Sequence, residues 1–338
     1  MTQVHVREQG AKVHRRGDRL VVTKQRQVLD QFPLEKVEEV ALHGNVQITT
    51  QAIAALLQRG VDVAFLSSQG TWRGWATGGE SSHVELRQKQ FMLLNDEQAA
   101  LQVSKAIVDA KIHNQRVVLQ RQAKRVHVDQ AMFDKALVGM MAMKQQSAGA
   151  QDLDALRGYE GKAAVFYFAA IRALIDPAWG FAKREYYPPP DPFNALLSFS
   201  YSLLLKEVRT AIRLTGLEIH LGFFHAVSRG RPSLALDLME EWRPLISDSL
   251  CLELINRGSL VPEEFVRTGR PSRPVELGDM GIVRVLEAYG SRLETRLFHP
   301  MAGPGGQTSL QNAIRLQAQR VARLVDGREA AYEPMRAK

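Results

Sequence analysis

Hydrophobic and polar residues alternate in short runs over the first 80 residues of the chain, and such alternation is typical of β-strands with one buried face. The pattern predicts strands over residues 2–8, 19–23, 27–30, 37–42, 61–66 and 71–76. Between them, apolar residues at helical spacing predict one helix, which Thr50 caps and Gly60 ends. We therefore expect a small β-rich domain over residues 1–80.

The pattern changes after residues 78–82, a stretch of glycine, glutamate and serine that is typical of a linker. From there, hydrophobic residues recur at helical spacing to about Asp326, with a basic loop at 267–274 and a glycine- and proline-rich loop at 299–306. The sequence thus predicts an α+β multidomain protein. Its β-rich domain precedes a larger, all-α domain over residues 81–338.

One helix should lie at the centre of the larger domain. It begins with Asp-Pro, a typical helix start, and little of its surface over residues 191–214 is polar. Asn194 and Tyr201 are the exceptions, and buried side chains of these types normally satisfy local hydrogen bonds. The preceding residues 186–190, Tyr-Tyr-Pro-Pro-Pro, must form an extended connector.

Candidate ligands for a metal lie in and before a short helix, which Pro232 should begin and Ser233 should cap. Asp237 and Glu240 stand three residues apart, so they are neighbours on the face opposite the apolar stripe. This spacing fits a shared cation, but an ordinary solvated face fits it as well and is the commoner case. His225 alone is a weaker indication, because most histidines are surface or hydrogen-bonded core residues.

Glu160 precedes a second apolar stripe, which runs from Ala164 to Ile175. Extending the stripe backward by one helical turn reaches Glu160, and Gly158 and Gly161 leave room around it. A carboxylate on a core-facing line is costly unless it is paired or bound to metal. An ion pair with an arginine and a metal site are equally compatible with this position.

These segments together resemble the CRISPR-associated integrases of spacer acquisition. The likeness covers nearly the whole chain, and several motifs occur in the family's order. They are residues 44–50, 60–66, 111–115, 184–201, 225–244, 317–327 and 332–334.

The resemblance implies that the larger domain binds a divalent metal and is catalytic. The family's metal ligands carry over onto Glu160, His225 and Glu240, with Asp237 as the accompanying acid, and the resemblance leaves open which of Asp237 and Glu240 touches the ion directly. In this family the residues matching Asn194 and Tyr201 lie near the metal, which implies that they support the site. The carboxylates suit both Mn²⁺ and Mg²⁺, and coordination partly by an imidazole favours Mn²⁺ of the two.

The resemblance also implies an activity and partners. Members of the family join the 3′-hydroxyl ends of captured DNA fragments to phosphates at the border of a CRISPR repeat, and with water the same site is an endonuclease. They act on double-stranded DNA as homodimers, joined through the N-terminal domain, with a small companion CRISPR-associated adaptation protein. Two other classes stay open: a metal-dependent nuclease for branched DNA in repair, and a DNA-holding subunit without catalysis.

The charge of the chain agrees with a polyanionic partner, since 44 Lys and Arg residues outnumber 36 Asp and Glu residues and give a net charge of +8. Six arginines are candidates for phosphate contacts: Arg229 and Arg231 first, then Arg184, Arg243, Arg270 and Arg273. A long helix expected over residues 97–125 also becomes basic from Lys111 onward. For the arginines and for this helix, a solvated surface without a particular role remains the alternative.

Composition excludes several other classes of protein. One cysteine, Cys251, rules out an internal disulfide, and no apolar run approaches the ~20 residues that cross a bilayer. Without a targeting peptide at its start, the chain is expected in the cytoplasm with no membrane partner. Residues 303–306 lack the lysine-serine ending of a phosphate-binding loop, and zinc-type cysteine pairs and a serine nucleophile elbow are also missing from the sequence.

Overall fold

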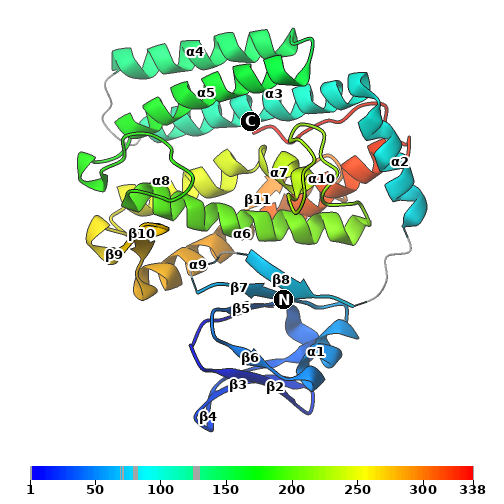
Figure 1. The fold of residues 1–338 in the computed structure, drawn as a ribbon, viewed down its shortest axis with the longest axis vertical. Coiled ribbons are helices and arrows are strands. Elements are labelled where there is room, and N and C mark those ends of the chain that lie inside the picture. The colour runs from blue at the N-terminus through cyan, green and yellow to red at the C-terminus, as the bar shows by residue number, and fades with distance from the viewer. Residues whose placement is uncertain (1, 69, 71, 79–82, 125–129, 338) are drawn as a thin grey trace. The chain divides into compact units, whose positions relative to one another are not determined.

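The computed structural model describes residues 2–68, 70, 72–78, 83–124 and 130–337 (Figure 1). The chain divides into two compact units, residues 1–82 and residues 83–338. The predicted linker at 78–82 falls at this division, and all of it except Gly78 lies outside the described residues. Among the residues that the structure describes, no helix is both long and apolar enough to cross a bilayer.

The described part of the N-terminal unit contains two four-stranded sheets and the helix α1 (Thr50–Leu57). One sheet has the order β1-β5-β7-β8, with strands Thr2–Val6, Val37–His43, Asp62–Leu66 and Trp72–Ala76. The other has the order β4-β3-β2-β6, with strands Gln27–Pro33, Arg19–Lys24, Lys12–Arg16 and Gln47–Ile48. In the first sheet β1, β5 and β7 run parallel, and β8 runs antiparallel to β7.

The six predicted strands of this unit are confirmed, whereas β2 and β6 do not follow from the sequence pattern. Only Val13 is buried in β2, among lysine, histidine and arginine side chains, so its alternation is weak. The predicted helix cap, Thr50, is wrong by one residue. Thr49 has the extended backbone of a cap, and its side chain accepts a hydrogen bond from Ala52 N at 3.2 Å.

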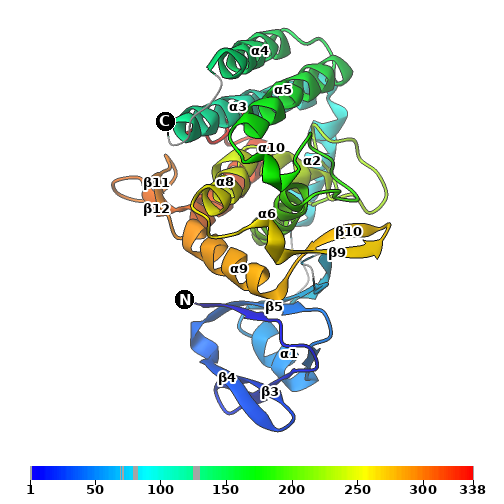
Figure 2. The same ribbon diagram turned by 90° about the vertical axis from the view of Figure 1, so that its left-hand side faces the viewer.

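The C-terminal unit is mainly helical, which confirms the predicted fold class. Its long helices α3 (Glu97–Ala123), α4 (Gln130–Ala148) and α5 (Leu153–Ala173) lie side by side (Figures 1 and 2). The other α-helices in the described part of this unit are α2 (Val84–Asn95), α6 (Pro192–Thr215), α7 (Ser233–Met239), α8 (Ser249–Asn256), α9 (Asp279–Leu293) and α10 (Leu310–Val325).

The helix α6 is central, as predicted, and packs against α7, α8 and α10. Asp191 caps it by accepting a hydrogen bond from Asn194 N at 2.8 Å, and Gly216 ends it with a left-handed φ of 81°. Phe193 and Leu204 on this helix are fully buried. Its polar exceptions include a buried ion pair between Lys206 and Glu207 that the hydrophobic pattern does not reveal.

Within the described residues of this unit, two short β-hairpins interrupt the helices. The strands β9 (Phe265–Arg270) and β10 (Arg273–Leu277) occupy the segment predicted as a basic loop, so that prediction was wrong. Phe265, Val275 and Leu277 are buried there, while Arg267 and Arg270 are exposed. The predicted loop at 299–306 connects β11 (Arg296–Phe298) and β12 (Gln307–Ser309).

Candidate metal site

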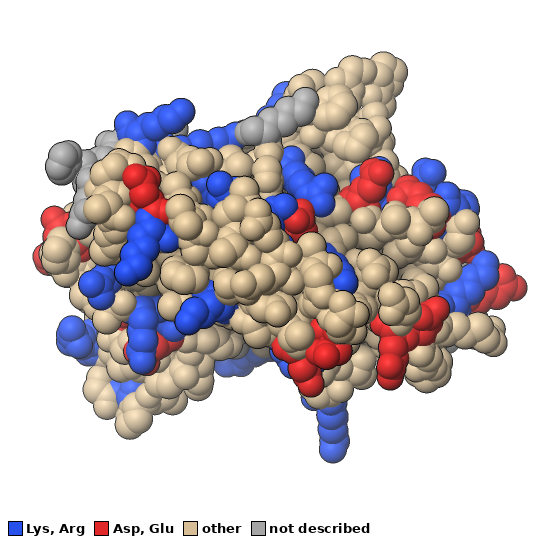
Figure 3. Space-filling model, turned by 90° about the horizontal axis from the view of Figure 1, so that it is seen from above, with Lys and Arg blue, Asp and Glu red and all other residues tan. Residues whose placement is uncertain are grey.

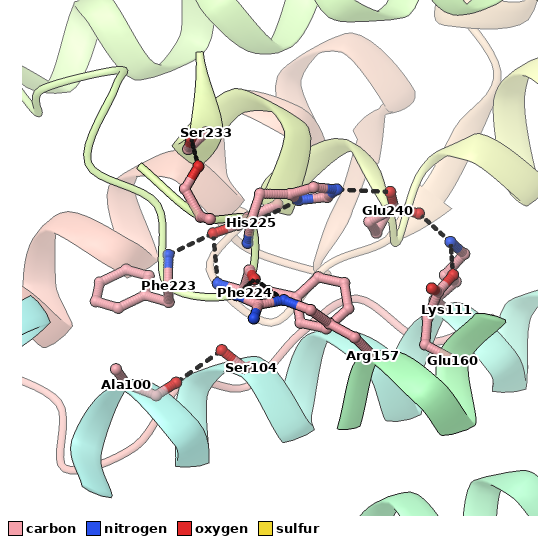
Figure 4. A network of polar contacts seen from close by, with 12 residues as sticks. Ala100, Ser104, Lys111, Arg157, Glu160, Phe223, Phe224, His225, Ser233 and Glu240 are labelled. Atoms are coloured by element: carbon pink, nitrogen blue, oxygen red, sulfur yellow. Dashed lines mark hydrogen bonds and ion pairs between the residues drawn. The ribbon is translucent and has the colours of Figure 1, made fainter. Parts of the chain in front are cut away.

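Four polar side chains from separate segments meet between α3, α5 and the end of α7 (Figure 4). Lys111 lies on α3, Glu160 on α5 and Glu240 directly after α7, while His225 lies in the loop before α7. The Nζ atom of Lys111 lies 2.5 Å from Glu160 Oε1 and 2.5 Å from Glu240 Oε2. The other oxygen of Glu240, Oε1, lies 3.9 Å from His225 Nε2. The structure thus brings the three predicted ligands together.

Asp237 fixes the orientation of His225. Its Oδ1 accepts a hydrogen bond from His225 N at 2.8 Å and lies 2.7 Å from His225 Nδ1, while its Oδ2 accepts from Phe223 N at 2.5 Å and Phe224 N at 3.0 Å. This arrangement directs His225 Nε2 toward Glu240 (Figure 4). Asp237 is fully buried and 4% of the Glu240 side chain is exposed, so the alternative of a solvated face is excluded for these two acids.

The loop that carries His225 lies closely against α7. A Cβ atom on Gly222 would lie 2.5 Å from the carbonyl carbon of Ser233 and 2.8 Å from Asp237 Oδ2, so only glycine fits at this position. Ser233 Oγ donates a hydrogen bond to Ala226 O at 2.9 Å. The prediction that Ser233 caps the helix was wrong, because the N-cap residue is Pro232 and Ser233 ties the loop to the helix start.

Positive neighbours keep Glu240 ionised. Burial alone would raise the pKa of Glu240, but the charges of Arg243, Lys111 and His225 outweigh burial and lower this pKa to about 2. Arg243 Nη2 lies 3.5 Å from Glu240 Oε1, and its guanidinium stands 4.8 Å from the centre of the Tyr201 ring. Glu240 is therefore a carboxylate at neutral pH, which is the form that binds a metal ion.

Lys111 is buried in the site rather than part of a solvated basic face, with 11% of its side chain exposed. Burial alone would lower the pKa of Lys111, but Glu160 and Glu240 raise it by a larger amount. Among the described residues, no three His, Cys, Asp or Glu side chains stand in a ready-made coordination sphere. The ammonium of Lys111 stands between two of the three predicted ligands.

The chemistry of these side chains nevertheless fits a divalent metal. Two carboxylates and an imidazole form a donor set that suits Mn²⁺ or Mg²⁺. Glu240 Oε2 is buried and accepts no hydrogen bond of normal geometry within the described part of the chain, although the ammonium of Lys111 is 2.5 Å away. A buried oxygen whose close partner is ionic is well placed to bind a cation.

Asn194, predicted to support the site, joins the start of α6 to residues 183–185, which precede the proline-rich connector. Its Nδ2 donates to Lys183 O at 2.9 Å and to Asp191 Oδ2 at 2.7 Å. Its Oδ1 accepts hydrogen bonds from Arg184 Nη1 at 2.8 Å and Glu185 N at 3.0 Å. The side chain of Asn194 is fully buried, and its partners are residues 183–185 and Asp191 rather than the acids of the site.

Tyr201, the second predicted supporting residue, reaches the site through Arg243. Its hydroxyl donates to Asp248 Oδ1 at 2.6 Å, and Tyr167 donates to Asp248 Oδ2 at 2.8 Å. Burial raises the pKa of Asp248 to about 6, although both hydrogen bonds act to lower it. The ring of Tyr201 lies beneath the guanidinium of Arg243, which pairs with Glu240.

Four of the arginines predicted to contact DNA lie either in the loop after His225 or in contacts inside the protein. Arg229 and Arg231 lie in the loop between His225 and α7, where Arg229 is exposed and Arg231 is half-buried. Across the described part of the chain, neither of their side chains has an ion-pair partner. Arg184 and Arg243 are engaged inside the protein, by Asn194 and Glu240 respectively.

Arg270 and Arg273 flank the turn of the β9–β10 hairpin, and both lie near Glu276, at 2.8 and 3.6 Å. Elsewhere, the face in Figure 3 shows lysines and arginines among acids rather than a single basic patch. On the predicted basic helix, Arg121 is exposed, while Arg125 lies outside the described residues.

Two features of the site do not follow from the sequence reasoning. One is the role of Lys111, and the other is the segment Tyr332–Ala337, which packs against α3. Asn114 Nδ2 donates to Glu241 O at 2.8 Å and to Met335 O at 2.9 Å, and its Oδ1 accepts from Ala337 N. The spacing of Lys111 and Asn114 is the one sequence signal for these features. The two residues stand three apart and share a face of α3, so both side chains are expected on the same side of the helix.

Comparison with known proteins identifies the family. The model of the family described as CRISPR associated protein Cas1 matches residues 4–291. The chain is 35% identical over 332 residues to CRISPR-associated endonuclease Cas1 1 of Thermus thermophilus, covering 98% of each chain. It is 33% identical to a CRISPR-associated exonuclease Cas4/endonuclease Cas1 fusion of Rhodospirillum rubrum, with 94% of this chain but 54% of the fusion covered. The chain thus spans about half the length of that fusion.

Solved structures share the fold. A casposase bound to integration product superimposes with a TM-score of 0.86 at 20% identity, over 100% of this chain and 95% of that chain. A Cas6-RT-Cas1–Cas2 complex gives a TM-score of 0.80 at 22% identity, over 98% of this chain and 36% of that chain. Together with the sequence matches, these likenesses confirm the resemblance seen in the motifs, and the chain belongs to the Cas1 family of CRISPR-associated proteins.

Proposed function

We propose that this protein is a metal-dependent DNA integrase and endonuclease, which inserts captured DNA fragments into a CRISPR array by 3′-hydroxyl attack on phosphodiesters at the repeat borders. The observation that carries the proposal is the convergence of Glu160 and Glu240 on the ammonium of Lys111, with His225 beside Glu240, in a member of the Cas1 family. The relatives named as endonucleases, and the fold shared with a casposase bound to integration product, support this class of reaction.

Glu160, Glu240 and His225 would hold a Mn²⁺ or Mg²⁺ ion. Hydrogen bonds to three backbone N–H groups and the contact with His225 Nδ1 already occupy both oxygens of Asp237. We therefore assign Asp237 the role of orienting His225 so that Nε2 faces the metal, rather than a place among the ligands. When bound, the ion supplies Lewis acidity at the attacked phosphate and stabilises charge on the departing 3′-oxygen.

The protein contributes position and charge to the exchange. A bond forms between the 3′-oxygen of the fragment and the target phosphorus while another phosphorus–oxygen bond breaks, so the number of phosphodiesters is unchanged and no nucleotide triphosphate is consumed. Arg243 beside Glu240 supplies a fixed positive charge next to the ligands. Arg229 and Arg231, in the loop that follows His225, are placed to contact target phosphates.

We further propose three partners for this reaction. Double-stranded DNA is favoured by the net charge of +8 and by the casposase complex of the same fold. A small companion adaptation protein is favoured by the fold shared with a complex that contains Cas1 and Cas2. The N-terminal unit is proposed to join two copies of the chain, as the family resemblance implies.

A strand-transfer assay with Glu160→Gln tests the proposal. Protein, companion, a fragment with 3′-hydroxyl ends, a plasmid with a repeat and Mn²⁺ are incubated, and covalent fragment–plasmid joints are measured on a denaturing gel. We expect a loss of at least about 100-fold in Glu160→Gln, with DNA affinity unchanged within about twofold. The control Glu287→Gln alters an exposed acid on α9 and should behave as the wild type.

Each alternative function gives a different result in the same assay. Joints formed equally well by Glu160→Gln and wild type contradict the proposed site. Cleavage of branched DNA without any joint indicates a repair nuclease. Binding of DNA with neither cleavage nor joining indicates a DNA-holding subunit.

A further inference from the structure

Lys111 occupies a position that a metal ion would need. Its ammonium comes from α3 and lies 2.5 Å from one oxygen of Glu160, on α5, and 2.5 Å from one oxygen of Glu240, after α7. The side chains are largely buried, with exposed fractions of 11%, 18% and 4% for Lys111, Glu160 and Glu240. The same two carboxylates are proposed metal ligands, so the ammonium and a metal ion would compete for the same oxygens (Figure 4).

The ammonium of Lys111 offsets the repulsion between the two carboxylates of the site. Two carboxylates that converge in a buried place repel each other unless a cation stands between them. Glu240 has Arg243 as a second cationic neighbour, at 3.5 Å, but within the described residues Glu160 has Lys111 as its ion-pair partner. Lys111 therefore holds Glu160 and Glu240 at a separation that a cation can bridge.

A bound divalent ion and this ammonium exclude each other. Mn²⁺ and Mg²⁺ bind carboxylate oxygens at about 2.0–2.2 Å, which places the ion in the region that the ammonium now fills. If the ammonium stayed in place, its charge and that of the metal ion would be almost in contact and would repel each other strongly in a partly buried site. The four-carbon stem of lysine is flexible, so the ammonium can withdraw while the α3 backbone stays in place.

We propose that Lys111 is a resident counter-ion of the metal site, which holds Glu160 and Glu240 together in the metal-free protein and competes with the divalent ion for their oxygens. The proposal rests on the proposed metal-binding function, since it concerns the same ligands. It makes Lys111 a positioning residue that sets metal affinity. We expect this competition to weaken metal binding relative to a site with the same ligands and no lysine.

The test measures metal affinity without any enzymatic reaction. Free Mn²⁺ gives an electron paramagnetic resonance signal that is lost on binding, so a titration of the purified full chain gives the dissociation constant and the stoichiometry. Lys111→Met removes the charge but keeps the length of the side chain, and we expect it to bind Mn²⁺ on the order of tenfold more tightly than wild type. Lys111→Arg keeps the charge, and its affinity should stay at or below that of wild type.

A second readout separates competition from general destabilisation. The metal-free Lys111→Met protein should melt at a lower temperature than wild type, because its two carboxylates lack their counter-ion. Adding Mn²⁺ should raise the melting temperature of Lys111→Met by more than it raises that of wild type. Lys144→Met is the matched control, since Lys144 on α4 pairs with Asp109 and with neither of the proposed carboxylate ligands. It should lower the melting temperature without changing Mn²⁺ affinity.

The outcomes distinguish this inference from the proposed function. If Glu160→Gln leaves Mn²⁺ affinity unchanged, the metal site itself is wrong. If Glu160→Gln weakens binding but Lys111→Met binds Mn²⁺ no more tightly than wild type, the metal site stands and the competition is wrong. Should Lys111→Met fail to fold, Lys111→Gln provides the same test, because it is neutral but keeps hydrogen-bond donors toward both carboxylates.

Discussion

Replacing Asp237 by asparagine should destabilise the C-terminal unit strongly. Asp237 is fully buried, and its oxygens have four close N–H partners, which belong to Phe223, Phe224 and His225. An asparagine keeps one acceptor oxygen and turns an amide NH₂ toward donors, so two of these contacts are lost. Hydrogen bonds to a charged group contribute ~1.5–3 kcal/mol each, which predicts a loss of ~3–6 kcal/mol.

Thermal and urea denaturation followed by circular dichroism would measure this effect. For a unit of this size the loss corresponds to a decrease in Tm on the order of 10 °C. Asp154→Asn is a matched control, because Asp154 on α5 is exposed and pairs with Arg157 at the surface. A Tm for Asp237→Asn within a degree of the control would refute the reasoning that Asp237 anchors the loop of His225.

Three further predictions concern the surroundings of the site. Gly222→Ala should cost ~1–3 kcal/mol in unfolding free energy, because its Cβ would overlap the backbone of Ser233; chemical denaturation checks this. Asp248 has a pKa of about 6 in the folded protein against an ordinary value of 3.8, so folding favours its protonated form. Its contribution to stability is therefore complete below pH ~3.8 and is lost as pH rises through ~6, a loss on the order of 3 kcal/mol. Denaturation of wild type and Asp248→Asn at pH 4 and pH 7 should show that this decline is smaller in the variant, and equal declines would contradict the assignment. Alanine at both Arg229 and Arg231 should make the salt dependence of duplex binding shallower by ~2 in log–log slope, and an unchanged slope would exclude them from the phosphate contacts.

Hydrophobic periodicity was sufficient to predict the fold class and the central helix. The alternation of hydrophobic and polar residues, with a period of two, predicted six strands. The near absence of polar residues over 191–214 predicted the central helix α6. Periodicity failed where few residues of a strand are buried. In β2 only Val13 is buried, and in the β9–β10 hairpin exposed arginines alternate with a few apolar residues, so the segment has the composition of a loop.

The acids and the histidine of the site were found from family motifs, but their contacts were not predictable. A lysine on a long helix usually lies on a solvated face, and nothing local to Lys111 shows that α5 and α7 bring carboxylates to it. The burial of Asp237 likewise depends on a loop that begins 15 residues earlier, at Gly222. Such contacts are set by tertiary packing, which outweighs local pattern.

A crystal structure of the protein soaked in Mn²⁺, with anomalous diffraction recorded at the manganese edge, tests the central claim most directly. We predict one anomalous peak within bonding distance of Glu160, His225 and Glu240, with the ammonium of Lys111 moved away from both carboxylates. A peak bound elsewhere, or no peak among these three side chains at saturating Mn²⁺, would contradict it.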